Sequence, residues 1–354
     1  MDIVLETADA FLFDHIYAKL FPVPQAVTTL LQATEPSNEL LLSLLKNLSL
    51  SYIPSEPYEY TFVSAPTTAY LSTIPRTNIV RQSISLFLIT WIFGVLLYFL
   101  FASLSYFLIF DKRTMDHPKY LKNQMRMEIQ QALSSVPWMS LYTVPWFLAE
   151  IHGYSHMYWD PNRYGNAYLF LQFPLFIAFT DFGIYLIHRG LHHPIMYKRL
   201  HKPHHKWIVP TPFASHAFHP MDGYLQSLPY HFFPFVLPLH KLSYLILFTF
   251  INIWTILIHD GEYMTNNPAV NGAACHTIHH LYFNYNYGQF TTLWDRIGGS
   301  YRTPEKSLFD QQTKMSKATW KKQASEMEKI VKEVEQEDNR QYLHDDAVEE
   351  KKEK

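Results

Sequence analysis

The feature that most constrains this chain is an uninterrupted uncharged stretch from Ser83 to Phe110. It is longer than the roughly 20 residues that cross the hydrocarbon core of a bilayer, so we predict a tilted transmembrane helix. Charged residues make up only 17% of the chain, against roughly 25% in ordinary soluble domains. Both observations favour an integral membrane protein over a soluble protein with one long core helix.

Three further apolar stretches are predicted to cross or enter the membrane. They run from Gln130 to Ile151, from Tyr168 to Ile187 and from Tyr224 to Ile258. The last is long enough for two passes, and because Pro238 to Lys241 interrupts it, a re-entrant hairpin is the alternative. We therefore expect an all-α integral membrane fold with about four transmembrane helices.

The charged residues beside the first span predict its orientation. Arg76 and Arg81 precede the span, and a larger group of cations follows it: Lys112, Arg113, Lys119, Lys122 and Arg126. This excess places the loop 111–129 in the cytosol and the N-terminus in the lumen, where the sequon Asn47-Leu48-Ser49 would be open to glycosylation. The stretches Gln130–Ile151 and Tyr168–Ile187 would cross to the lumen and back, and the two passes within Tyr224–Ile258 would do the same. Both histidine-rich regions would then lie on the cytosolic face.

The two ends of the chain differ from its centre in composition. We divide the chain into a lumenal arm (1–80), a histidine-rich membrane domain (81–310) and a charged cytosolic tail (311–354). Recurring prolines predict irregular structure with short amphipathic pieces in the arm. In the tail, Trp320 to Glu335 has helical propensity and the rest is expected to be mobile. The final Lys351-Lys352-Glu353-Lys354 resembles a dilysine retrieval signal of endoplasmic reticulum membrane proteins, the alternative being a solvated charged end.

Histidines are the compositional anomaly of the chain, which contains nineteen of them. Nine of them lie in three clusters, which are His188-Arg189-Gly190-Leu191-His192-His193, His201-Lys202-Pro203-His204-His205 and His276-Thr277-Ile278-His279-His280. Residues three and four apart share one face of a helix, so each cluster directs at least two imidazoles the same way. A lone histidine is usually a satisfied polar residue, but two copies of the HxxHH pattern are unlikely to arise by chance.

The clusters predict a metal centre built from imidazoles. Neutral imidazole binds zinc, copper and iron, so the ligand type leaves the metal open. Eight or more imidazoles exceed the four positions of a tetrahedral zinc site, which favours two metal ions. Cys275 is the only cysteine, so a cysteine-based zinc site is excluded, and the net charge of -2 gives no reason to expect nucleic acid as a partner.

The boxes HxxxH, HxxHH and HxxHH resemble those of the membrane-bound fatty acid hydroxylase/sterol desaturase superfamily. Two longer runs sharpen the resemblance toward its sterol C5-desaturase branch. They are PFASHAFHPMDG at 212–223 and NYNYGQFTTLWDRIGG at 284–299. The resemblance covers about residues 80 to 303, and the boxes alone are specific only to the superfamily.

The resemblance implies a non-haem di-iron enzyme that uses O2 to remove hydrogens from C5 and C6 of a Δ7-sterol such as episterol, late in ergosterol synthesis. Electrons would come from NADH through cytochrome b5 reductase and cytochrome b5. The box histidines carried over as metal ligands are His188, His192, His201, His204, His205, His276, His279 and His280. His193 and His259 match two additional family ligands.

Several residues near the boxes keep two interpretations. His216 and His219 are either ligands or residues that orient ligand histidines. Asp181 lies two helical turns before the first box, where it either accepts from a ligand imidazole or sits at the membrane interface. Asp260 and Glu262, beside His259, invite the same two interpretations.

Other residues are expected to lie outside the centre. The predicted topology puts His152 and His156 in a lumenal loop as interfacial residues, and Cys275 is expected to be a small buried residue. The aromatic run Tyr282 to Tyr287 would face the sterol or form part of the interfacial belt. Alternative functions are a sterol C4-methyl oxidase, a fatty acyl hydroxylase, or a non-catalytic protein that binds metal or senses sterol.

Overall fold

The computed structural model describes residues 1–25, 62–63 and 65–344. The sequon at Asn47 and the terminal lysines from Lys351 onward lie outside the described residues. The chain forms two compact units, one made of Met1–Phe93 with Ser140–Met157 and the other of Gly94–Met139 with Tyr158–Lys354. Two long helices, α5 (Ile79–Leu108) and α6 (Gln124–Ile151), contribute to both units.

The first unit is built around a helical N-terminus and a buried ionic network. Helices α1 (Asp2–Ala8) and α2 (Asp14–Leu20) are joined by a π-helical turn, so the arm begins with short helices. The Asp14 carboxylate contacts the guanidinium groups of Arg76 at 2.6 Å and Arg81 at 2.5 Å, and Asp9 contacts Arg81 at 3.0 Å. All four side chains are buried, so these charges neutralise one another.

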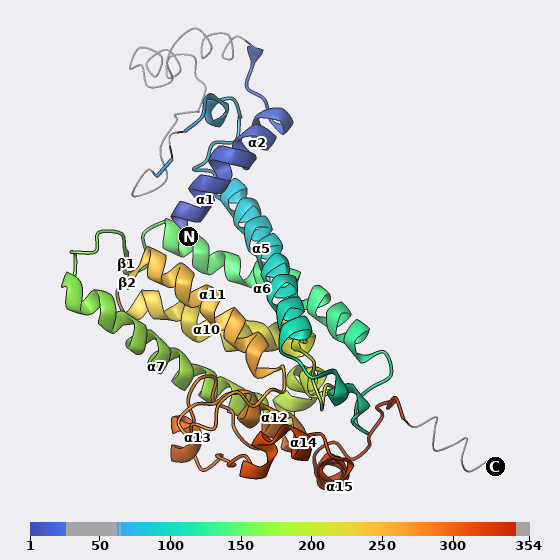
Figure 1. Ribbon diagram of the computed structural model, residues 1–354. Helices are drawn as coiled ribbons and strands as arrows, with labels where there is room; N and C mark the ends of the chain where they lie inside the picture. Colours follow the sequence, from blue (N-terminus) through green and yellow to red (C-terminus); the bar gives the residue numbers. More distant parts are fainter. Residues whose placement is uncertain (26–61, 64, 345–354) are drawn as a thin grey trace. The chain divides into compact units, whose positions relative to one another are not determined.

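The second unit contains the remaining helices and both short strands. Its elements are α7 (Gly165–Leu191), α8 (Pro194–Met196), α9 (Lys202–His205), α10 (Pro220–Val236), α11 (Lys241–Ile258), α12 (Ala273–Tyr282), α13 (Leu293–Ile297), α14 (Gln311–Lys314), α15 (Lys317–Val334), β1 (Met157–Tyr158) and β2 (Leu239–His240). Figure 1 shows α7, α10 and α11 side by side, with α12 to α15 gathered at one end of them.

Three helices of the described chain are long and apolar enough to cross a membrane, and they are α5, α7 and α11. On α5, Leu96, Leu100 and Phe107 expose their side chains, as expected of a surface that faces lipid. The interruption predicted within Tyr224–Ile258 is confirmed, since α10 ends at Val236 and α11 begins at Lys241. The all-α membrane fold is therefore confirmed, and the number of four spans stays a prediction.

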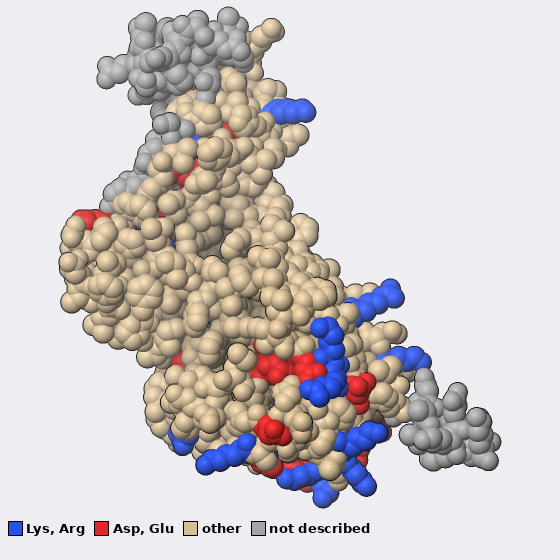
Figure 2. Space-filling view, viewed as in Figure 1, with Lys and Arg blue, Asp and Glu red and all other residues tan. Residues whose placement is uncertain are grey.

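Charge is distributed unevenly over the second unit. Figure 2 shows Lys, Arg, Asp and Glu side chains gathered over the end formed by α12 to α15, whereas α7, α10 and α11 are nearly bare of charge. An apolar surface next to a charged cap is the pattern of a helical bundle that emerges from a bilayer. We use "cap" for this charged end, residues 194–219 and 259–344.

Helices α7 and α10 pack closely because Gly183 has no side chain. A Cβ atom at Gly183 would lie 2.7 Å from Cγ of Pro229, too close for any real contact. The packing matters for function, since α7 ends in the first histidine box and α10 carries Asp222 in its first turn.

The cap has its own hydrophobic core, which includes part of the charged tail. Trp207, Ile278 and Phe283 pack with Met327 of α15 and with Tyr342 beyond it. Main-chain hydrogen bonds hold residues 341–343, from the amide of Lys122 to the carbonyl of Gln341 and from the amide of Leu343 to the carbonyl of Tyr120. The expectation that the tail is mobile beyond its helix is therefore wrong as far as residue 344.

Candidate metal centre

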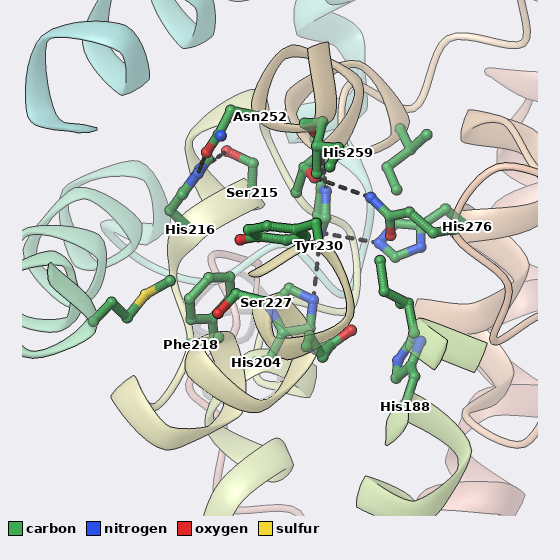
Figure 3. Close-up of a pocket in the computed structure, with 18 of the residues that line it drawn as sticks. His188, His204, Ser215, His216, Phe218, Ser227, Tyr230, Asn252, His259 and His276 are labelled. Atoms are coloured by element: carbon green, nitrogen blue, oxygen red, sulfur yellow. Dashed lines mark hydrogen bonds between the residues drawn. The ribbon is translucent and has the colours of Figure 1, made fainter. Parts of the chain in front are cut away.

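Nine histidines from four segments converge in the second unit to form two groups. The five-histidine group consists of His188, His192, His201, His205 and His279, and the four-histidine group consists of His204, His259, His276 and His280. Within each group the ligand nitrogens lie within 4.8 Å of one another. All nine are buried except His192, which is half-buried. Figure 3 shows His204, His259 and His276 turned toward one another.

The HxxHH pattern explains how two short helices serve both groups. On α9 and the turn before it, His201 and His205 enter the five-histidine group and His204 enters the other. On α12 the division is reversed, because His276 and His280 enter the four-histidine group and His279 the five-histidine group. Residues four apart point the same way along a helix, and the residue between them points to the neighbouring group.

Hydrogen bonds to the outer ring nitrogens set the orientation of several imidazoles. His188 Nδ1 donates to the Tyr287 carbonyl at 2.9 Å, His279 Nδ1 donates to the Tyr285 carbonyl at 2.8 Å, and His259 Nδ1 donates to the Thr255 carbonyl at 2.6 Å. Since a carbonyl oxygen only accepts, each of these Nδ1 atoms carries the proton. The Nε2 lone pairs are then free to bind a metal.

Of the nine histidines in the two groups, all within the described residues, His201 alone has a carboxylate partner. Its Nδ1 lies 2.7 Å from Oδ2 of Asp222, and both side chains are fully buried. Such a carboxylate fixes the tautomer of a metal-binding histidine and raises its basicity. Asp222 was not selected as a site residue from the sequence, because it lies 21 residues from His201.

The inner nitrogens approach one another closely in both groups. His205 Nε2 lies 3.0 Å from His279 Nε2, and His276 Nε2 lies 2.9 Å from His259 Nε2. Where two unprotonated nitrogens face each other, their lone pairs repel unless a cation lies between them. This convergence fits two metal ions, one per group.

The buried imidazoles are held in the neutral form that binds metals. Burial lowers the pKa of His205, His276 and His280 well below its usual value, and neighbouring histidines lower it further. Five imidazoles in one group are more than tetrahedral zinc accepts, whereas iron takes higher coordination numbers with nitrogen ligands. The donor set of the five-histidine group therefore fits iron, and the four imidazoles of the other group are compatible with iron as well.

His193 does not join either group. Its side chain is exposed, and its Nδ1 accepts a 3.5 Å contact from the amide of Ile195 at the start of α8. By contrast His259, the other histidine that the resemblance added to the boxes, belongs to the four-histidine group.

The three carboxylates singled out in the sequence contact groups other than imidazoles. Asp181 accepts from the amides of Gln289 at 3.0 Å and Phe290 at 2.7 Å. Asp260 accepts from Ser105 at 3.4 Å, and Glu262 forms an ion pair with Lys314 at 2.9 Å. These acids hold loops around the centre, so the interpretation of Asp181 as a partner of a ligand imidazole is not supported.

The loop after the third box is positioned by Asp295, which sequence reasoning missed. Its carboxylate accepts from the amides of Tyr287 and Gly288, both at 2.8 Å. A Cβ atom at Gly288 would lie 2.4 Å from the Thr291 carbonyl, so glycine is required there. The loop matters because it presents the carbonyls of Tyr285 and Tyr287 to the histidines.

The other candidate histidines lie outside both groups. His216 is buried and interacts through Nε2 with Asn252 Oδ1 at 3.2 Å, and His219 caps α10 by accepting from the amide of Met221 at 3.2 Å. In the first unit, His152 contacts Gln82 at 3.0 Å. His156 is exposed.

A cavity opens beside the histidines. His188, His204, His259 and His276 line it together with the apolar side chains of Ile184, Phe218, Tyr230, Ile251 and Ile258. Figure 3 shows the Tyr230 ring beside the histidines and the polar group formed by Ser215, His216 and Asn252 at another side of the cavity. Histidines of both groups thus face the cavity, so a metal held by either group would lie beside a ligand bound there.

Comparison with known proteins relates the whole chain to one group of enzymes. The fatty acid hydroxylase family model matches residues 173–300. The chain is 56% identical to a probable Delta(7)-sterol 5(6)-desaturase of Neurospora crassa, with 97% of each chain covered. It is 57% identical to a Delta(7)-sterol 5(6)-desaturase of Aspergillus fumigatus over 97% of each chain, and 50% identical to one of Saccharomyces cerevisiae over 98% of each. No solved structure matches the chain.

Proposed function

The chain belongs to the Delta(7)-sterol 5(6)-desaturase family, and from this premise we propose that it introduces the C5–C6 double bond of a Δ5,7-sterol in the endoplasmic reticulum membrane. Membership makes it an oxidoreductase of sterol biosynthesis. The observation that carries the proposal is the pair of histidine groups that opens onto an apolar cavity. We expect an episterol-like substrate in the ergosterol pathway.

Two non-haem iron ions are the proposed cofactors. The five-histidine group would hold one and the four-histidine group the other. When bound, the irons would supply O2 activation and abstraction of hydrogen from unactivated carbon. His193 is left out of the proposed ligand set because its exposed ring lies outside both groups.

The stoichiometry requires an external electron donor. Removing one hydrogen each from C5 and C6 provides two electrons and two protons, while reduction of O2 to two water molecules needs four of each. The missing two electrons must come from outside, since the chain has one cysteine and its imidazoles are not redox carriers. We propose NADH as their source, through cytochrome b5 reductase and cytochrome b5.

The protein itself would exclude water and orient the sterol. Ile184, Phe218 and Ile251 give the cavity apolar walls, which would contact the substrate and keep bulk water from the reacting carbons. Polar side chains also line the cavity, and among them we propose the Asn252–His216 pair as the partner of the sterol hydroxyl. Fixing the hydroxyl would place C5 and C6 relative to the histidines.

The sterol profile of cells that lack the protein tests the reaction. We expect Δ7-sterols without the 5,6 double bond to accumulate, and the Δ5,7-sterols to return when the gene is restored. An unchanged Δ5,7-sterol pool in cells without a paralogue would contradict the proposal. Accumulation of C4-methyl sterols or of non-hydroxylated acyl chains would instead favour one of the related oxygenases.

A further inference from the structure

A second cavity lies between the cap and the segment 121–127, and its walls are strongly basic. It has a volume of about 440 Å³, against about 80 Å³ for the cavity beside the histidines. Five cations and one carboxylate line it, namely Lys122, Lys198, Lys202, Lys206, Arg340 and Glu335. We call it the basic pocket.

The charge of the basic pocket is only partly compensated. Glu335 contacts Arg340 at 2.9 Å and Lys202 at 3.1 Å, and Arg340 also contacts Asp338 at 3.1 Å. Lys206 contacts the sulfur of Met127 at 3.4 Å rather than an acid. Among the described residues, no carboxylate forms an ion pair with Lys198 or Lys206, so the pocket would attract an anionic group.

The wall between the basic pocket and the metal centre is helix α9. Lys202 and Lys206 are four residues apart and line the pocket, whereas His201, His204 and His205 of the same segment belong to the histidine groups. Less than one helical turn therefore separates the pocket from the proposed ligands.

Direct contacts also cross this wall. Arg340 Nη2 donates to the carbonyl of His205 at 3.0 Å. The Tyr197 hydroxyl donates to Glu335 at 2.9 Å, and the Tyr197 ring lies 5.8 Å from the His205 ring between centroids. The pocket is thus joined to the metal centre through both main-chain and side-chain contacts.

We propose that the basic pocket is the docking site of an acidic one-electron carrier protein. The inference rests on the proposed function, because desaturation needs two external electrons delivered one at a time. The nine histidines are buried or half-buried, so a carrier cannot touch the metals and must dock where the intervening protein is thin. The pocket meets that condition and carries charge that complements carboxylates on the carrier's surface.

Charge reversal at the rim tests the docking. The test uses membranes that contain the Lys122→Glu/Lys198→Glu variant, in which two exposed lysines of the basic pocket are reversed in charge. At low salt we expect the KM for cytochrome b5 to rise about tenfold and to depend less on ionic strength. The reason is that exposed charges at the edge of an interface govern the rate at which the two proteins associate. Turnover with a small-molecule reductant, dithionite with methyl viologen, should not change. As a matched control, the exposed pair Lys321→Glu/Lys329→Glu on α15 should leave both rates unchanged.

A binding measurement keeps this test separate from the test of the reaction. Titration of the detergent-solubilised protein with oxidised cytochrome b5 should give a Kd about tenfold higher for the pocket variant than for the control. If the wild type turns over with neither donor but shows this difference in binding, the proposed reaction fails and the docking site stands. Equal Kd and KM values for pocket variant and wild type would overturn the docking site.

The same variants distinguish a rival ligand. If charge reversal removed binding to vesicles that contain a phosphorylated inositol lipid and left the Kd for cytochrome b5 unchanged, the pocket would be a phosphate-binding site and our inference would be wrong.

Discussion

At the scale of single residues, the metal centre depends on which nitrogen of each imidazole carries the proton. Backbone carbonyls of Thr255, Tyr285 and Tyr287 and the carboxylate of Asp222 all accept from Nδ1. Each such contact leaves Nε2 free, and the rings cannot rotate without losing a buried hydrogen bond. These contacts hold four of the nine imidazoles in a metal-binding orientation.

His204→Ala should abolish turnover while the protein still inserts into the membrane. His204 is fully inside the four-histidine group, so its loss leaves three imidazoles, and we expect bound iron to fall from two ions to about one per chain. Activity should drop more than about 100-fold, because loss of a residue that only hydrogen-bonds a metal ligand already costs up to about 100-fold. Iron analysis and sterol conversion measure the two effects.

The matched control is His156→Ala. His156 is exposed and outside both groups, so its replacement should leave iron content and turnover nearly intact. A dead His156→Ala enzyme would contradict the ligand assignment, as would an active His204→Ala enzyme with full iron.

Asp222→Ala should weaken metal binding without removing a ligand. His201 would lose its buried carboxylate partner, and such outer partners typically contribute about 10–100-fold in metal affinity. Competition with a chelator of known iron affinity measures the change. Asp160→Ala, at an exposed loop position, is the control, and equal iron affinity in both variants would argue against a role for Asp222.

At the scale of elements, two packed helices set the distance between the first box and Asp222. Helix α7 carries His188 and α10 carries Asp222 in its first turn, and the two helices meet at Gly183 and Pro229. Adding one methyl group at this contact would shift α7 relative to α10, and with them His188 relative to Asp222, because closely packed interiors transmit strain.

Gly183→Ala should therefore destabilise the second unit. The new Cβ would lie 2.7 Å from Pro229, and overpacking of this kind costs about 1–3 kcal/mol. Thermal unfolding of the protein in detergent should show a lower Tm. Gly190→Ala, on the same helix with nothing within 4 Å of its Cβ, should leave the Tm unchanged or raise it slightly.

At the scale of the whole molecule, the membrane helices and the cap have different roles in the proposed reaction. Apolar helices provide the cavity walls, and the charged cap, together with the end of α7 and the segment 121–127, carries the histidine groups and the basic pocket. This arrangement would let an apolar sterol and a water-soluble electron carrier reach the same metals from different sides. It also makes the cap depend on metal, because nine imidazoles crowd its centre.

Metal removal should lower the stability of the folded chain as well as its activity. Converging Nε2 lone pairs repel one another without a cation, and a metal present at a thousand times its Kd adds roughly 4 kcal/mol of stability. Chelation should lower the Tm, and zinc should restore the Tm but not turnover, since zinc has no redox chemistry. A Tm that is insensitive to chelation would contradict the two-metal assignment.

The sequence alone determined those features that depend on short windows. Insertion depends on local hydropathy, so the apolar run from Ser83 identified α5, and Pro238 located the break between α10 and α11. The spacing of the HxxxH and HxxHH boxes is likewise local, and it selected eight of the nine clustered histidines, with His259 supplied by the resemblance.

Only the tertiary structure decided how these histidines are shared and supported. The division of each box between two groups depends on how α7, α9, α11 and α12 meet. Asp222 reaches His201 across 21 residues, and Arg340 reaches the His205 carbonyl across 135. Contacts of this kind leave no periodic signal in the sequence, because they arise from packing between segments far apart in the chain.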